Sequence, residues 1–309
     1  VVPAGDPALW ATPPFEPTVR DGKLYARGAA DMKGSVAAAA VAFARLVQEK
    51  PDHPGTLAFL ITSDEEGDGH EGTKRVVQKL KDEGVTIDAC IVGEPSCSRF
   101  FGDTIKNGRR GSLNGKVTIR GKAGHVAYPH LAKNPIHEAA PFFAELASRQ
   151  WDQGNDYFGP TTFQISNIQA GVGAVNVVPG ELTALFNIRF NTEWTAERLI
   201  KTIEDLAAKY RLDACFEWKR SAEPFVTNPG CMTQKLTQAI ADVTGVRPEL
   251  STGGGTSDAR FISSISRETV EFGPINATIH SVNECAGIDE LEALAEIYYR
   301  TAKAYLENF

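Results

Sequence analysis

Two short apolar runs constrain the fold of this chain most strongly. Residues 56–62 (TLAFLIT) and 87–92 (IDACIV) each have the length of a strand and are largely apolar. Such runs are typical of strands that are buried on both faces of a sheet. Residues 35–49 and 73–84 carry apolar side chains at helical spacing. The alternation of helix and strand predicts an α/β layered domain in which both runs are buried strands.

The pattern changes near residue 111. Helical spacing predicts helices at 134–149 and 195–209, the second with Thr195 as its N-cap. Strands are expected before, between and after these helices, at 112–120, 163–170, 182–190 and 214–219. This β-α-β-β-α-β order is typical of a ferredoxin-like α+β sandwich.

The α/β pattern resumes after Pro224. The elements expected outside the sandwich are a hairpin at 19–27, helices at 232–244 and 289–306, and a strand at 269–272. We therefore expect a discontinuous first domain at 1–110 and 224–309. A second domain, at 111–223, is inserted into it.

Composition excludes several classes of partner. The net charge is −7 and no basic block stands out, which argues against a nucleic-acid partner. No apolar run approaches the roughly 20 residues of a membrane helix. The five cysteines form no CxxC pair and their number is odd, which favours a reducing, cytoplasmic location.

Acidic residues gather where the expected strands of the first domain end. Glu65 and Glu66 follow residues 56–62, Glu94 follows residues 87–92, and Asp31 lies in a loop before a helix. Ligands of open α/β sheets bind at these carboxyl ends of the strands. Each acid alone is typical of a solvated loop. Four together are costly without a neutralising cation, so with His280 from a later loop they predict a metal centre.

Zinc suits this set of residues, because imidazole and carboxylate oxygens are its usual ligands in catalytic sites. Two metal ions bridged by a carboxylate activate water and polarise a carbonyl group. One further carboxylate must stay off the metals to carry the proton to the leaving amine. Neighbouring side chains of an extended segment point in opposite directions, so Glu65 and Glu66 can divide these two tasks.

The motifs around these residues resemble the M20 family of dinuclear metallopeptidases and deacylases. The segments that carry the resemblance are 27–34 (RGAADMKG), 63–67 (SDEEG), 93–95 (GEP), 107–137, 173–181 (GAVNVVPGE), 253–261 (GGGTSDARF) and 272–284 (FGPINATIHSVNE). They span nearly the whole chain and are specific as a set. The resemblance implies a zinc-aminopeptidase-like catalytic domain and hydrolysis of a linear amide.

The resemblance also implies roles for single residues. Asp31 would bridge two Zn²⁺ ions, with Co²⁺ as an alternative metal. Glu66 and His280 would complete one site, and Glu94 would bind the other ion. Glu65 would act as general base and then as general acid.

The inserted domain is implied to be a lid that forms a homodimer. His125 would reach the active site of the partner and support the oxyanion of the tetrahedral intermediate. The implied substrate is a small acylated amino acid with several carboxylates, for which arginines are suitable clamps. Arg109 and Arg189 are the candidates. The expected hydrogen-bonding contacts are Tyr128, Asn176, Gly255, Thr256 and Asn276.

One part of the family pattern falls outside this sequence. The family has a His-x-Asp motif just before Val-Val-Pro, and the sequence begins with Val1-Val2-Pro3. The resemblance therefore predicts that the site on the Glu94 side lacks its His, and that activity is weak. Neither His53 nor His70 is expected to replace it. Other N-acyl-amino-acid deacylases and dipeptidases of the family share the metal residues, and a non-catalytic dimerisation module stays open as an alternative.

Overall fold

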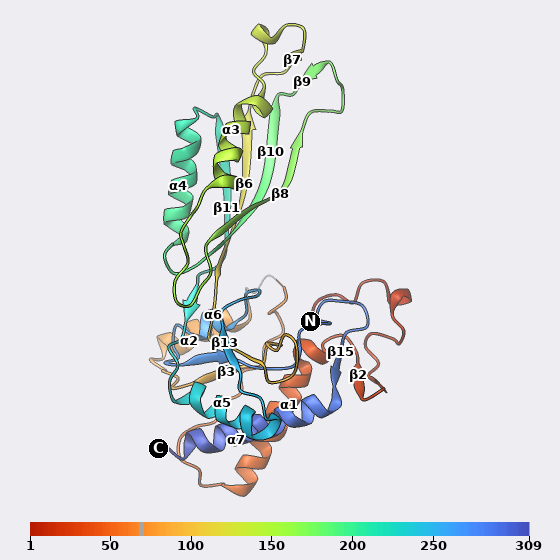
Figure 1. The fold of residues 1–309 in the computed structure, drawn as a ribbon, viewed down its shortest axis with the longest axis vertical. Coiled ribbons are helices and arrows are strands. Elements are labelled where there is room, and N and C mark those ends of the chain that lie inside the picture. The colour runs from red at the N-terminus through yellow and green to blue at the C-terminus, as the bar shows by residue number, and fades with distance from the viewer. Residues whose placement is uncertain (68–70, 309) are drawn as a thin grey trace. The chain divides into compact units, whose positions relative to one another are not determined.

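The computed structural model describes residues 1–67 and 71–308, and the chain divides into two compact units (Figure 1). Unit 1 comprises residues 1–109, 226–253 and 257–309. Unit 2 comprises residues 110–225 and 254–256.

Unit 1 contains a four-stranded mixed sheet with the strand order β13-β4-β14-β3. β13 runs parallel to β4 and β14 runs parallel to β3, whereas β14 and β4 are antiparallel. A smaller antiparallel sheet has the order β1-β2-β15. The strands are β1 (Thr18–Arg20), β2 (Lys23–Tyr25), β3 (Cys90–Val92), β4 (Thr104–Lys106), β5 (Gly108–Arg109), β13 (Glu249–Ser251), β14 (Thr269–Glu271) and β15 (Cys285–Gly287).

The core of unit 1 lies between the four-stranded sheet and three helices. α1 (Gly34–Glu49) and α5 (Cys231–Thr244) both pack on α7 (Ile288–Leu306). α1 buries Ala38, Ala42 and Leu46, which recur every fourth residue and so share one face. The shorter helical elements are η1 (Pro7–Leu9), η2 (Ala29–Lys33), α2 (Thr73–Asp82) and α6 (Ala259–Ile262). Among the described residues, no helix is both long enough and apolar enough to cross a membrane.

Unit 2 is a four-stranded antiparallel sheet with the order β11-β6-β10-β8. Alternate residues of β6 (Leu113, Val117 and Ile119) are buried, and they pack in one core cluster with residues of α3 and α4. Asn134 and Thr195 cap these helices by accepting backbone N–H bonds. The elements are β6 (Gly111–Arg120), β7 (Gly124–His125), η3 (Pro129–Leu131), α3 (Pro135–Ser148), β8 (Thr162–Ala170), β9 (Val177–Val178), β10 (Glu181–Phe190), α4 (Ala196–Lys209) and β11 (Ala214–Ala222). The short strand β12 (Phe225–Val226) includes the last residue of unit 2 before the chain returns to unit 1.

Most predicted elements are confirmed. The helices at α1, α2, α3, α4, α5 and α7, the hairpin β1–β2 and the strands β6, β8, β10 and β11 all form within a few residues of the expected bounds. The β-α-β-β-α-β order and the strand order of unit 2 are those of a ferredoxin-like sandwich.

The prediction of a buried strand at 56–62 is wrong. This segment forms no strand, and Phe59, Leu60 and Ile61 are 44%, 42% and 64% exposed. The second apolar run forms only the three half-buried residues of β3, at the edge of its sheet. Apolar composition predicts that a segment tends to be buried, but burial on both faces also requires a neighbouring strand. Within residues 1–67 and 71–308, no strand pairs with 56–62 or with the free edge of β3.

Candidate active site

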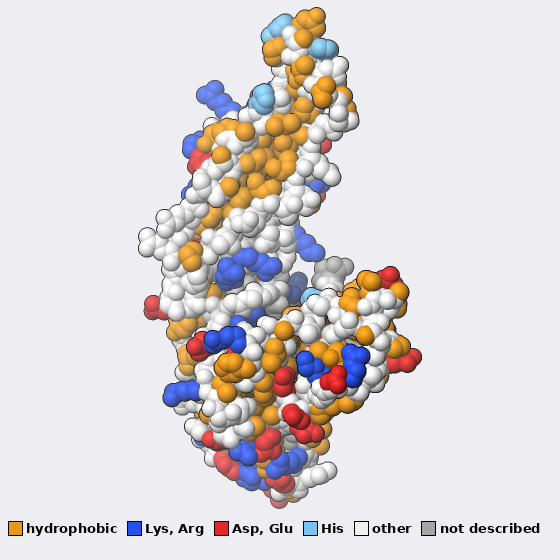
Figure 2. Space-filling model, turned by 45° about the vertical axis from the view of Figure 1, so that its right-hand side comes forward, with side chains coloured by type: hydrophobic (Ala, Val, Ile, Leu, Met, Phe, Trp, Pro, Cys, Tyr) orange, Lys and Arg blue, Asp and Glu red, His pale blue; other side chains and the backbone are white. Residues whose placement is uncertain are grey.

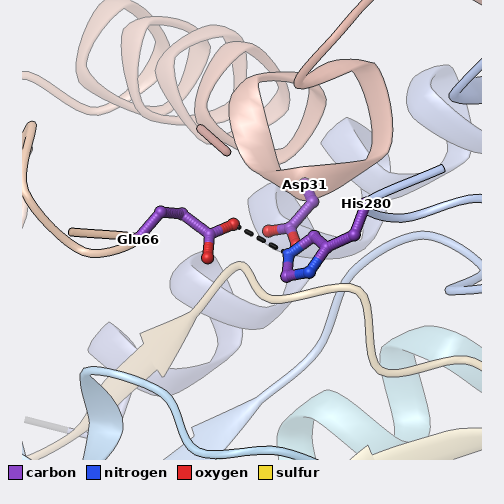
Figure 3. Close-up of side chains that lie close together, drawn as sticks. All are labelled: Asp31, Glu66 and His280. Carbon is purple, nitrogen blue, oxygen red and sulfur yellow. Dashed lines mark hydrogen bonds and ion pairs between the residues drawn. The ribbon is translucent and has the colours of Figure 1, made fainter. Parts of the chain in front are cut away.

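Asp31, Glu66 and His280 come together in unit 1 and point toward one another (Figure 3). The Nε2 atom of His280 lies 3.0 Å from Oε1 of Glu66 and 3.2 Å from Oδ2 of Asp31. Potential ligand atoms of all three lie within 4.8 Å of one another. In the described part of the chain, this is the one group of three or more such residues. Two carboxylates and one imidazole are a donor set that fits zinc.

Local structure places each of the three side chains. Asp31 lies in η2, Glu66 lies in the turn after residues 56–62, and His280 lies in the loop between β14 and β15. The hydroxyl of Thr278 closes this loop: it donates to the carbonyl oxygen of Cys285 at 2.9 Å and accepts the N–H of Cys285 at 3.1 Å. His280 lies within this closed loop, with its backbone in the left-handed region at a φ of +59°.

Burial and charge act against an ionised Asp31 in this cluster. The side chain of Asp31 is 12% exposed. Burial raises the pKa of this carboxyl, the charge of Glu66 raises it further, and His280 lowers it. A bound cation would offset the cost of ionising Asp31, since an opposite charge stabilises the ionised carboxylates.

Glu65 lies beside the cluster and outside its set of potential ligands. Burial raises the pKa of Glu65 to about 7, and the nearby charges of Asp258, Glu66 and Asp31 act in the same direction. Arg260 lowers the pKa. A carboxyl with a pKa near neutrality can both accept and return a proton at physiological pH.

Glu94 also lies outside the three-residue cluster. It follows β3, and burial raises its pKa well above the usual range. The negative charges of Asp31, Glu271 and Glu65 raise it further. Glu94 is therefore close enough to Asp31 to interact electrostatically, and its surroundings favour either a proton or a cation.

Arg109 is buried and its guanidinium is occupied within unit 1. Its Nε atom donates to both carboxylate oxygens of Glu271, at 3.0 and 3.1 Å, and Nη1 donates to the carbonyl oxygen of Gly253 at 2.9 Å. The hydroxyl of Ser257 donates to the same carboxylate. These contacts fix both ends of the Gly253–Ser257 loop that includes Gly255 and Thr256. The role of Arg109 as a substrate clamp stays a prediction.

Three of the predicted contacts lie at one end of unit 2. β7, which contains His125, pairs with β9, and the N–H of Val126 donates to the carbonyl oxygen of Asn176 at 3.2 Å. The rings of His125 and Tyr128 are 5.8 Å apart. His125, Tyr128 and Asn176 are all exposed.

The two remaining predicted contacts differ in their surroundings. Arg189 lies half-buried in β10, where burial and the neighbouring charge of Arg110 lower its pKa. No ion pair joins Arg189 to any carboxylate among the described residues. In unit 1, the N–H of Asn276 donates to the carbonyl oxygen of Cys97 at 2.9 Å.

The structure adds two residues that the sequence reasoning did not select. Asp258 and Arg260 both influence the charge of Glu65. The Nε atom of Arg260 is buried and has no hydrogen-bond partner among the described residues. The available signal is the charged run Ser257-Asp258-Ala259-Arg260, which follows the three glycines at 253–255 after one threonine.

Comparisons with known proteins identify the family of this chain. The model of peptidase family M20/M25/M40 matches residues 1–304. A succinyl-diaminopimelate desuccinylase from Thiobacillus denitrificans is 55% identical over 306 residues, which cover 99% of this chain and 78% of the relative. A protein of the same name from Nitrosomonas eutropha is 54% identical, with 99% and 81% covered.

Solved structures share the fold. An M20 family metallo-carboxypeptidase from Sulfolobus solfataricus superposes with a TM-score of 0.83 at 17% identity, covering 99% of this chain and 83% of that protein. The YXEP protein of Bacillus subtilis, described as a dinuclear metal binding peptidase from the M20 family, gives a TM-score of 0.64 at 18% identity, with 91% and 72% covered. Together with the family match over residues 1–304, these findings show that the chain belongs to peptidase family M20/M25/M40.

Proposed function

We propose that this chain hydrolyses N-succinyl-L,L-2,6-diaminopimelate to succinate and L,L-2,6-diaminopimelate, a step of diaminopimelate and lysine biosynthesis. Relatives that are 53–55% identical over nearly the whole chain carry the name of this activity. The structural observation that carries the proposal is the cluster of Asp31, Glu66 and His280 with Glu65 beside it.

In this proposal Asp31, Glu66 and His280 hold one metal ion, and Asp31 with Glu94 holds a second. The ions are Zn²⁺, with Co²⁺ as an alternative. When bound, they supply a Lewis acid that polarises the amide carbonyl and lowers the pKa of water. Within residues 1–67 and 71–308, Glu94 is not part of any group of three potential ligands. We therefore propose that the Glu94 side binds its ion more weakly and that activity is low.

Glu65 moves the proton. Its carboxylate takes a proton from the attacking water, and the protonated carboxyl then gives it to the nitrogen of the leaving amine. A pKa of about 7 suits both steps, because neither the charged nor the neutral form is strongly disfavoured.

Arginines are proposed to bind the carboxylates of the substrate. Arg189 and Arg110 form a positive pair in unit 2, and the Nε atom of Arg260 is buried without a partner in the described structure. A substrate carboxylate would satisfy donors of this kind. Arg109, by its observed contacts, is better suited to hold the Gly253–Ser257 loop. Further proposed hydrogen-bonding contacts are Tyr128, Asn176, Gly255, Thr256 and Asn276.

Unit 2 is proposed to act as a lid and to form a homodimer in which His125 supports the oxyanion in the partner's active site. β8 is an edge strand of its sheet, and Ile168 in it is 52% exposed. The outer side of α3 exposes Ile136, Ala140 and Ala144. Hydrophobic side chains gather on the surface of this unit (Figure 2). An apolar helix side beside an unpaired strand edge is suited to pairing with a second copy.

The location proposed for this enzyme is the cytoplasm. All five cysteines are free, and Cys215 and Cys231 among them are exposed. Exposed free thiols are typical of reducing compartments.

The test is a substrate panel with the zinc-loaded chain. Turnover of N-succinyl-diaminopimelate should exceed that of N-acetylornithine and of dipeptides, and Glu65→Gln should remove it. If the chain turned over another acyl amino acid faster, the proposed activity would be that of a different deacylase of the family. Zinc binding without turnover of any member of the panel would favour a non-catalytic module.

A further inference from the structure

A buried carboxylate lies between the two chain segments that carry Asp31 and His280. The side chain of Glu284 is 1% exposed, and all its acceptor positions face backbone or guanidinium donors. Its Oε1 atom accepts the N–H groups of Ala30 at 3.0 Å and of Asp31 at 2.9 Å. Its Oε2 atom accepts the N–H of Gly28 at 2.9 Å and Nη1 of Arg27 at 2.7 Å.

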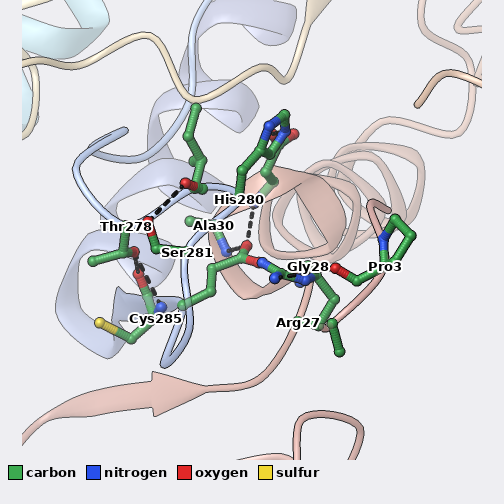
Figure 4. A network of polar contacts seen from close by, with 12 residues as sticks. Pro3, Arg27, Gly28, Ala30, Thr278, His280, Ser281 and Cys285 are labelled. Carbon is green, nitrogen blue, oxygen red and sulfur yellow. Dashed lines mark hydrogen bonds and ion pairs between the residues drawn. The ribbon is translucent and has the colours of Figure 1, made fainter. Parts of the chain in front are cut away.

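Arg27 neutralises this carboxylate and fixes it in place. The guanidinium is 2% exposed, lies 5.1 Å from the ring of Trp10, and contacts the carbonyl oxygen of Pro3 at 3.4 Å. Removal of one partner from a buried ion pair of this kind strongly destabilises the folded protein, because an unpaired buried charge remains. Figure 4 draws this network, in which Arg27, Gly28 and Ala30 are labelled together with His280.

One side chain therefore ties two distant segments together. Glu284 bonds the backbone of Asp31 itself, although the two residues are 253 positions apart. It also follows His280 by four residues, in the loop that Thr278 and Cys285 close. Glu66 takes no part in these bonds. The contacts thus fix the backbone of Asp31 to the loop that carries His280.

We propose that Glu284 is a positioning residue that sets the separation of Asp31 and His280 for the metal ion. This inference rests on the proposed function, in which both residues bind the ion. Partners that orient metal ligands typically change metal affinity by about 10–100-fold when they are altered. The same range is expected here.

The central experiment is Glu284→Gln. The amide keeps one acceptor oxygen but places an NH₂ group against two donors, so part of the segment 27–31 must shift. The zinc dissociation constant, measured by competition with a chromophoric chelator, should rise by about 10–100-fold. The visible absorption of the Co²⁺ form should also change. At saturating zinc, KM should equal that of the parent chain and most of kcat should return.

Glu268→Gln is the matched control. Glu268 is 7% exposed and accepts the N–H groups of Gly230, Met232 and Thr233 at 3.0, 2.9 and 2.7 Å, at the start of α5. Like Glu284, it is a buried carboxylate that accepts backbone N–H groups, but in the described structure it bonds none of Asp31, Glu66 and His280. The substitution should lower Tm, whereas the zinc dissociation constant should stay within about twofold of the parent value.

The outcomes separate the two proposals. A zinc dissociation constant for Glu284→Gln within twofold of the parent value overturns the inference, and so does an equal loss in Glu268→Gln. If Glu284→Gln does not fold, Arg27→Lys takes its place: several-fold weaker zinc binding supports the inference, and parent-like binding overturns it. A parent chain that binds no zinc overturns the proposed function itself.

Discussion

Two sides of the site hold the same kind of carboxyl group in different surroundings. Asp31 and Glu66 face the imidazole of His280, which lies within 3.2 Å of both. Burial raises the pKa of Glu94 well above the usual range, the charges of Asp31, Glu271 and Glu65 raise it further, and Arg109 lowers it. The two sides therefore differ in whether further potential ligands converge on the carboxyl group: in the described structure they do so at Asp31 and Glu66 and not at Glu94.

The largest effect is expected from His280→Ala. The cluster then retains two carboxylates without a nitrogen donor, so zinc binding should weaken by more than about 100-fold, beyond the 10–100-fold range of residues that only orient ligands. Equilibrium dialysis with metal analysis measures this. His53→Ala removes a loop histidine outside the cluster and should leave the metal content unchanged. A parent-like zinc content in His280→Ala would contradict the assignment.

Glu65→Gln should separate chemistry from metal binding. Removal of a general base typically costs a factor of about 10²–10⁴ in rate. The kcat should fall by this factor while the zinc content stays at the parent value, since Glu65 is not in the ligand group. Loss of zinc in this variant would instead make Glu65 a ligand.

The pH profile should report the ionisation of Glu65. Only the carboxylate accepts a proton, so turnover should decline as the pH falls through the pKa of about 7. Arg260 lowers this pKa, so Arg260→Met should move the midpoint to higher pH and raise KM. Steady-state kinetics between pH 5 and 9 measures both. A midpoint that does not move in Arg260→Met would remove Arg260 from the surroundings of the base.

The smallest effect is expected on stability, at Glu94. The folded chain raises the pKa of Glu94 above the ordinary 4.5, so the folded state binds more protons than the unfolded state between these two pKa values. Metal-free stability should fall as the pH rises above 4.5 and level off above the folded pKa. Glu94→Gln removes the cost of burying the charged carboxylate. The Tm at neutral pH should therefore rise, by about 2–4 °C for each kcal/mol gained in the free energy of unfolding.

Calorimetry with and without zinc tests the Glu94 prediction. The variant should be more stable than the parent without metal and should gain less from added zinc. Stabilisation by zinc equal to that of the parent would show that Glu94 binds no ion.

Much of unit 2 could be predicted from the sequence. In β6, Leu113, Val117 and Ile119 alternate with outward-facing residues, and this period also fixes which face is buried. The caps Asn134 and Thr195 begin their helices through local contacts. Short-range patterns were sufficient to predict these elements, because the strands of unit 2 pair with one another and its own helices pack on their sheet.

The site was less predictable for a physical reason. The motifs selected Asp31, Glu66 and His280, but the exclusion of Glu94 from their cluster depends on three-dimensional distances. In the sequence, Glu284 is only the last residue of a motif, because nothing local indicates a carboxylate that bonds a segment 253 positions away. The strand predicted at 56–62 is wrong because the sequence of this run does not specify the strand that must pair with it.

That exposed run affects the behaviour of the protein in solution. Phe59, Leu60 and Ile61 form a β-prone, uncharged stretch that no ladder protects in the described structure. Segments of this kind act as templates for aggregation, because their free N–H and C=O groups pair with the same stretch of another molecule. The chain should therefore precipitate at a lower concentration than its net charge of −7 suggests. Ile61→Lys should raise its solubility limit.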